Sequence, residues 1–302
     1  MWFMFSLLAL ICWSGSDLFS KIGCSDARDK YSHLKMVTAV GVVMGLHAAY
    51  EIFIGGTEMS WGVMLTYLPV SALYILSMAI GYVGLRYIEL SISSPICNSS
   101  GALVAVLTLA IDGADGFSPL QLVAVALVCI GVVALGVTES REDEALRKAR
   151  QDKANRHYAK SWIAIAIPII YCLLDALGTF ADSRVLMTLD EDSANAAYEL
   201  TFFAVGVVSA IYVLGIKKQK LFIKQEGPKY IGAVCETAGQ LAYIYAIADT
   251  EHVALSAPII SAYCMLSVVW SRIFLKERLS AKHYISIAVV VIGIVILGIF
   301  DA

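Results

Sequence analysis

The chain has 302 residues, of which 59% are hydrophobic and only 16% are charged, and its mean hydropathy is +0.75. Soluble globular proteins carry roughly 25% charged residues, so this composition excludes a soluble globular chain and predicts an integral membrane protein. The formal net charge of −3 excludes a nucleic-acid binder that works through a basic surface.

Apolar stretches long enough to cross a bilayer as helices, about 20 residues each, recur along the whole chain. We predict ten of them, which in chain order are residues 2–22, 34–54, 62–84, 91–111, 119–137, 161–181, 194–216, 229–248, 253–274 and 281–300. The first has no basic segment before it and no small-residue cleavage site after it, so we expect a retained helix rather than a signal peptide. The predicted fold is an all-α integral membrane protein with ten transmembrane helices.

The one polar interruption covers residues 139–160. Oppositely charged residues lie there four positions apart, which is the spacing of a solvated helix, in the pairs Asp143/Arg147, Glu144/Lys148 and Asp152/Arg156. We predict a charged linker between two halves, residues 1–138 and 161–302. A regulatory docking segment is the alternative interpretation.

The basic residues are distributed unevenly between the two sides of this arrangement. All 22 Lys and Arg residues except Arg184 lie in or beside the loops that follow the odd-numbered stretches. Cytoplasmic loops of membrane proteins carry the excess of Lys and Arg. We therefore predict a multi-pass protein of the cell membrane (plasma or inner membrane), with the linker 139–160 in the cytoplasm and both termini outside.

The two halves share motifs at corresponding places. The fifth stretch contains IGVVALG (residues 130–136) and the tenth contains IGIVILG (292–298), while the fourth opens with SISSP (91–95) and the ninth with ALSAP (254–258). Because each half holds five crossings, the second half must enter the membrane from the opposite side. This predicts two five-helix repeats of inverted topology, an architecture that permits alternating access to a central site.

These paired motifs, together with LKER (residues 275–278) before the last stretch, resemble the EamA-type members of the drug/metabolite transporter superfamily. The resemblance extends over essentially the whole chain and implies a carrier of small metabolites, without selecting a substrate. One segment departs from the family pattern, because residues 111–115 read IDGAD where the family usually repeats its Glu-Arg element. No functional role is transferred to that loop.

Carboxylates inside the predicted membrane helices are the strongest functional signal. Placing an acidic residue at the centre of such a helix costs about 2.5–3.5 kcal/mol, and four lie well within the stretches: Asp17, Asp175, Glu199 and Glu236. Asp17 and Asp175 occupy comparable places in the first helix of each half. Each has an aromatic residue one turn earlier on the same helix face, Trp13 and Tyr171 respectively.

The eighth stretch adds a polar stripe at helical spacing, made of Glu236, Gln240 and Tyr243. Excess negative charge beside aromatic rings favours binding of an organic cation or of a proton. Structural roles stay open: Asp17 could pair with Lys21, Glu236 could hydrogen-bond to a neighbouring helix, and Glu199 could be interfacial. Isolated aromatic residues are expected to serve packing or the interface; they include Tyr74, Tyr82, Tyr245, Tyr263 and Trp270.

We predict a secondary active transporter that moves a small amine-bearing metabolite (an amino acid, an amine or a quaternary amine) by alternating access, with proton coupling or exchange. The alternatives are a flippase for a lipid-linked solute and a non-transporting membrane scaffold. No nucleophile–base pair, metal cluster or Walker motif is recognised, so neither an enzyme nor a cofactor or metal is expected. The spacing Gly41-x3-Gly45 predicts a helix–helix contact within the chain or in a homodimer.

Overall fold

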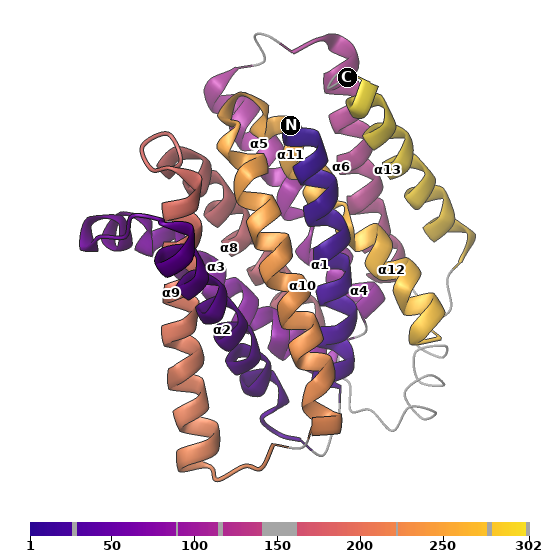
Figure 1. The fold of residues 1–302 in the computed structure, drawn as a ribbon. Helices are drawn as coiled ribbons and strands as arrows, with labels where there is room; N and C mark the ends of the chain where they lie inside the picture. The colour runs from indigo at the N-terminus through magenta and orange to yellow at the C-terminus, as the bar shows by residue number, and fades with distance from the viewer. Residues whose placement is uncertain are drawn as a thin grey trace.

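The computed structural model describes residues 1–25, 29–88, 90–113, 117–140, 162–221, 223–276 and 280–299. Over these residues the regular structure is helical throughout (Figure 1). Eight helical segments are long and apolar enough to cross a membrane, and two shorter apolar helices cover Pro119–Leu135 and Ala281–Leu297. The chain is therefore a helical integral membrane protein, whereas the number of ten crossings stays a prediction.

The helices follow one another in two comparable series. The first is α1 (Trp2–Cys24), α2 (Ser32–Tyr50) with the π-helical turn η1 (Glu51–Gly55), α3 (Trp61–Tyr87), α4 (Leu90–Cys97), α5 (Ser100–Asp112) and α6 (Pro119–Ser140). The second is α8 (Trp162–Val185), α9 (Glu191–Ala210) with the π-helical turn η2 (Ile211–Ile216), α10 (Ile223–Ala248), the 3-10 turn η3 (Thr250–His252), α11 (Val253–Ser261), α12 (Tyr263–Phe274) and α13 (Ala281–Ile299). The predicted linker 139–160 lies, after its first two residues, outside the described residues.

Polar residues just before the helices fix several helix starts. The Ser60 hydroxyl accepts a hydrogen bond from the Val63 amide at 3.2 Å, and the Asp190 carboxylate accepts one from the Ser193 amide at 2.9 Å. At the start of α6 the Ser118 hydroxyl accepts from the Gln121 amide while the Gln121 side chain accepts from the Ser118 amide. Such caps satisfy amide groups that have no partner inside the helix.

The fourth and ninth predicted stretches are each broken into two helices, which the sequence analysis did not anticipate. Each break comes shortly after a proline: α4 ends two residues after Pro95, and α11 ends three residues after Pro258. The Asn98 side chain donates to the Ser94 carbonyl oxygen at 2.8 Å and so stabilises the first break. Both breaks lie inside segments that are long and apolar enough to cross a membrane, Ser93–Asp112 and Thr250–Phe274.

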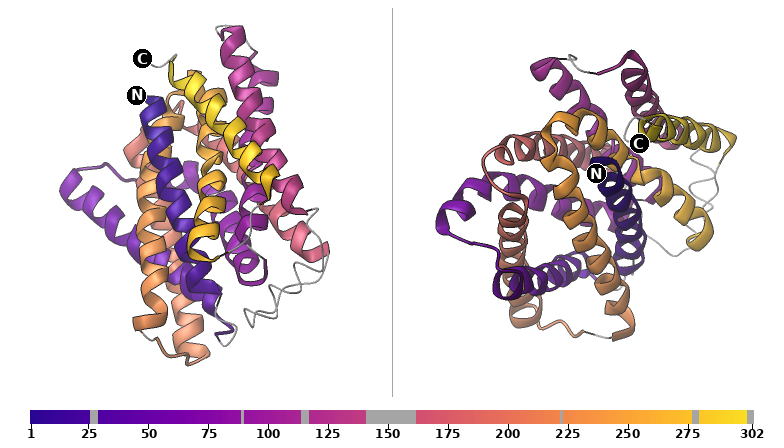
Figure 2. Two further views of the ribbon diagram at one scale, coloured as in Figure 1. Left: turned by 90° about the vertical axis from the view of Figure 1, so that its right-hand side faces the viewer. Right: turned by 45° about the horizontal axis from the view of Figure 1, so that its top comes forward.

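The helices pack in pairs around that centre. α1 lies against α10, α3 against α8, α2 against α9 and α6 against α13 (Figures 1 and 2). The start of α1 and the end of α13 lie at the same end of the bundle (Figure 2). Outward-facing side chains are apolar along its length, including Leu46, Ile130 and Val295, as a surface in contact with lipid requires.

Glycines let two of these pairs approach closely. A Cβ atom at Gly41 of α2 would lie 2.8 Å from the Gly206 Cα atom of α9, and a Cβ atom at Gly45 would lie 2.4 Å from the Phe203 ring. The predicted Gly41-x3-Gly45 contact is therefore made within one chain. The tenth predicted stretch contains IGIVILG, which matches IGVVALG of the fifth. A Cβ atom at its Gly293, in α13, would lie 2.8 Å from a backbone oxygen of α6. This glycine therefore lets the two helices pack closely.

Candidate functional site

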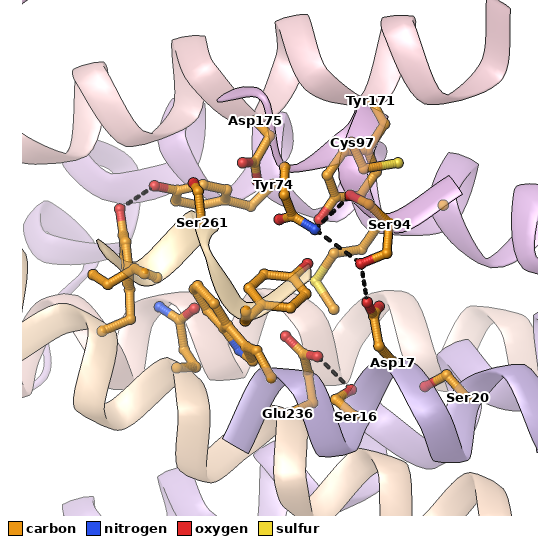
Figure 3. A pocket seen from close by; sticks show the side chains of 18 of the residues that line it. Ser16, Asp17, Ser20, Tyr74, Ser94, Cys97, Tyr171, Asp175, Glu236 and Ser261 are labelled. Atoms are coloured by element: carbon orange, nitrogen blue, oxygen red, sulfur yellow. Dashed lines mark hydrogen bonds between the residues drawn. The ribbon is translucent and has the colours of Figure 1, made fainter. Parts of the chain in front are cut away.

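A cavity lies at the centre of the bundle, and the two broken helices reach it at their breaks (Figure 3). Its volume is about 80 Å³, counted as the space that the centre of a water-sized sphere can occupy. One water needs about 10–15 Å³ by that measure, so the space fits a small solute. Side chains of α1, α3, α8 and α10 form most of its walls, and the broken pairs α4–α5 and α11–α12 complete them.

Asp17 and Asp175 both face this cavity, on α1 and α8. The Asp17 carboxylate accepts hydrogen bonds from the hydroxyls of Ser94, in broken helix α4, and of Ser267, in α12, the latter at 2.7 Å. The Asp175 carboxylate accepts one from the Ser100 hydroxyl at 2.7 Å, where α5 begins. Each acid is thus oriented by a serine beside a helix break.

Glu236 is the third carboxylate of the cavity, and the polar stripe that was predicted on α10 faces the same space. The Glu236 carboxylate accepts a hydrogen bond from the Ser16 hydroxyl at 2.6 Å (Figure 3). Gln240 and Tyr243 follow it on the cavity wall. Helical spacing places these three side chains on one face of α10, and this face lines the cavity.

The described cavity wall contains no Lys, Arg or His. Hydroxyl donors orient the three carboxylates but carry no charge to balance theirs. Lys21, the local partner considered for Asp17, instead donates to the carbonyl oxygens of Leu85 (2.7 Å) and Ile88 (2.5 Å), at the end of α3. A lysine there satisfies carbonyl groups that the helix leaves without partners. The cavity is consequently an acidic site inside an apolar bundle.

Aromatic rings cover much of the remaining wall. The Trp13 ring lies 5.2 Å from the Tyr243 ring and 5.8 Å from the Tyr263 ring, and Tyr171 of α8 lines the same cavity (Figure 3). Tyr263 was expected to serve packing or the interface, but its side chain lines this cavity. The same holds for Tyr74 and Tyr82, which with Met78 form one face of α3 at spacings of four residues, a pattern visible in the sequence.

Known proteins resemble the chain in sequence over its second half and in fold over its whole length. Residues 162–299, from α8 to α13, match the model of the EamA-like transporter family. This match covers the second half of the chain and shows that this half is similar to the family. No curated protein sequence matches it. A solved crystal structure aligns with 98% of this chain and 96% of its own, at a TM-score of 0.63 and 12% identity, which shows the fold alone.

The EamA-like family consists of membrane transporters of small solutes, not of enzymes. Its matched segment supplies Asp175, Glu236, Gln240 and Tyr243 to the cavity, while the first half supplies Asp17 and Trp13. The acidic site is therefore built by both halves of the chain. Among the described residues, no group of three or more His, Cys, Asp or Glu side chains could hold a metal ion.

Glu199 lies apart from the cavity, although its neighbour Tyr198 lines it. The Glu199 carboxylate is buried and contacts His47 Nδ1 at 2.9 Å, and His47 Nε2 lies 3.6 Å from a Glu51 oxygen. Adjacent residues on a helix point about 100° apart, so a carboxylate next to a cavity residue can face a neighbouring helix instead. Here Glu199 faces α2.

A further buried carboxylate, Asp182, is absent from the predicted site residues, because it lies beyond the predicted end of its membrane stretch. Its side chain is fully buried and accepts hydrogen bonds from the hydroxyls of Tyr67 (2.8 Å) and Tyr74 (3.4 Å). The signal was available, because Asp182 follows Asp175 by seven residues and so shares its helix face.

Proposed function

We propose that this protein is an EamA-like secondary active transporter that moves a small amine-bearing solute by alternating access, in symport with or in exchange for protons. The observation that carries the proposal is the central cavity, in which Asp17, Asp175 and Glu236 meet without a basic residue on the described wall. A low-dielectric site with unbalanced negative charge attracts a mobile cation. Transport requires that this cation can leave the site again. A proton that binds to the same carboxylates removes their charge and so releases the cation.

The aromatic wall favours an organic cation over a metal ion. The faces of Trp and Tyr rings attract ammonium groups, and Trp13, Tyr171 and Tyr243 surround the carboxylates. Two buried polar groups on the wall, Gln240 Nε2 and the Tyr82 hydroxyl, have no hydrogen-bond partner among the described residues. Buried polar groups are normally paired, so a solute that also carries oxygen atoms suits this site better than a bare hydrocarbon amine.

Alternating access also needs two interchangeable halves, and we propose that α1–α6 and α8–α13 are inverted five-helix repeats. The contacts of α1 with α10 and of α3 with α8 are equivalent under such a repeat, as are those of α5 with α11 and of α4 with α12. Residues with a positive φ angle follow equivalent elements in both series. They are Gly56 after η1 and Lys218 after η2, and Gly113 after α5 and Lys276 after α12. These correspondences support the repeat and its ten crossings.

The orientation that we propose places both termini outside and the linker 139–160 in the cytoplasm of a cell membrane. Basic residues gather at the end of the bundle opposite the termini, where Lys35 contacts Asp29 (2.8 Å) and Glu226 (3.4 Å), and Lys229 contacts Glu226 (3.0 Å). This buried ion-pair network joins α2 to α10.

A thermal-shift screen of the full-length protein in detergent tests the proposed function. Cationic and zwitterionic metabolites, represented by choline, putrescine and lysine, are expected to raise the unfolding temperature, because a ligand that binds only the folded state stabilises it. Anionic metabolites such as succinate should have no effect. Stabilisation by anions alone would contradict the proposal.

A further inference from the structure

Asp182 lies between the central cavity and the end of the bundle that holds the termini. Thr179, one turn before it on α8, lines the cavity, while Ser183, the next residue, lines a separate groove with Asp112, Arg184 and His252. That groove is near the N-terminus, because the His252 ring stacks on Trp2 at 5.2 Å. A buried carboxylate therefore lies where a route from the outer groove to the cavity would pass.

Hydroxyl groups connect this carboxylate to the cavity. The Tyr74 hydroxyl donates to Asp182 at 3.4 Å, and it also bonds to the Thr179 hydroxyl at 3.1 Å and to the Tyr243 hydroxyl. Tyr74, Thr179 and Tyr243 all line the cavity. Tyr243 follows Glu236 by two turns, about 10 Å, on the same face of α10, so the chain of hydroxyls ends on the wall of the cavity that holds the acidic site.

The other groups around Asp182 leave its charge unbalanced within the described part of the chain. Tyr67 of α3 donates to its second oxygen at 2.8 Å, and Tyr198 of α9 packs against Tyr74 with ring centroids 6.0 Å apart. Arg184, two residues further on, contacts Asp112 of α5 at 2.8 Å. No described Lys, Arg or His forms an ion pair with Asp182, and an intramembrane carboxylate of that kind calls for a function.

We propose that Asp182 is a second proton-binding group of the transport cycle, and that Tyr74 and Tyr243 pass the proton between it and the cavity. A hydroxyl can donate and accept at once. Protonated Asp182 would give its proton to the Tyr74 oxygen while Tyr74 gives its own to Tyr243, and Tyr243 releases one toward the cavity carboxylates. One proton moves, no bond between heavier atoms changes and nothing is oxidised. The inference rests on the proposed function, since it assigns a route to the proton that drives transport.

The test compares two activities of each variant in proteoliposomes, with labelled choline, putrescine or lysine, whichever the screen retains. Uptake driven by a pH gradient requires proton movement, whereas exchange of labelled for unlabelled amine does not. The ratio of the two activities cancels differences in folding and in amount of protein. We expect this ratio to fall at least tenfold in Asp182→Asn and in Tyr74→Phe. It should be unchanged in Tyr67→Phe, which loses a hydrogen bond to the same carboxylate but not the connection to the cavity.

The outcomes separate this inference from the proposed function. An unchanged ratio in Asp182→Asn or in Tyr74→Phe would overturn the proton route, and so would an equal fall in Tyr67→Phe, which would show that Asp182 only anchors α8 to α3. If Asp182→Asn does not fold, the comparison of Tyr74→Phe with Tyr67→Phe decides. If the wild-type protein exchanges amines but does not respond to a pH gradient, the protein is still a carrier of amines, and the proposed proton-binding role of Asp182 is overturned. Absence of exchange in the wild type would instead contradict the proposed function itself.

Discussion

Asp17→Asn and Asp175→Asn proteins are expected to transport amine-bearing solutes at least tenfold more slowly than the wild type. Asparagine keeps an oxygen that can accept the hydrogen bonds of Ser94 or Ser100, but it carries no charge and takes up no proton at this oxygen. A hydrogen bond to a charged group contributes about 1.5–3 kcal/mol, which corresponds to about 10- to 100-fold in affinity. Uptake of labelled amine into proteoliposomes measures the loss.

Asp112→Asn is the matched control for these variants. Asp112 lies at the end of α5, pairs with Arg184 at 2.8 Å and is exposed, away from the cavity. Its replacement should leave amine uptake close to the wild-type rate. Wild-type rates in both cavity variants would show that the carboxylates are structural, and the mechanism proposed above would be wrong.

Trp13→Ala is expected to weaken amine binding by about tenfold. The Trp13 ring lies on the cavity wall between Tyr243 and Tyr263, and a cation over such a ring gains about 0.5–2 kcal/mol. Removing the ring also enlarges the cavity, so the solute is held less closely. Calorimetric titration with the amine retained by the screen gives the dissociation constant directly.

Trp270→Ala provides the comparison, because Trp270 donates to the Ser14 hydroxyl at 3.2 Å and packs beside Phe274, outside the cavity wall. It removes a ring of the same size from the same protein and should leave the dissociation constant unchanged. Trp13→Phe should recover part of the lost affinity. Equal losses in the two alanine variants would indicate a general effect on folding rather than a ring that contacts the solute.

The sequence predicted the helical membrane class and most of the acidic site, because both follow from local patterns. Apolar length identifies a membrane helix, and helical spacing placed Glu236, Gln240 and Tyr243 on one face. Asp17 and Asp175 occupy comparable places in the two halves of the sequence, and both side chains face one cavity. None of these inferences needed knowledge of which helices are neighbours.

What the sequence did not predict depends on contacts between helices. Glu199, like Asp175, is a carboxylate in an apolar stretch, yet it faces His47 of α2 because α9 packs there. Tyr74 was expected to serve packing or the interface, and its hydroxyl contacts Thr179 and Tyr243 instead. Lys21 is one turn from Asp17, but its amine reaches carbonyl oxygens of α3. Periodicity gives the face of a helix, whereas the partner of that face is set by the fold.

The central claim is that the acidic cavity selects positive charge. It is tested most directly by calorimetric titration of the full-length protein with choline and with the neutral analogue in which a carbon atom replaces the nitrogen. The two molecules have nearly the same shape, so charge is the main difference between them. We expect choline to bind at least tenfold more tightly, and this preference should fall in Asp175→Asn, in which Asp17 and Glu236 still line the cavity. Equal binding of the charged and the neutral molecule by the wild type would contradict the claim.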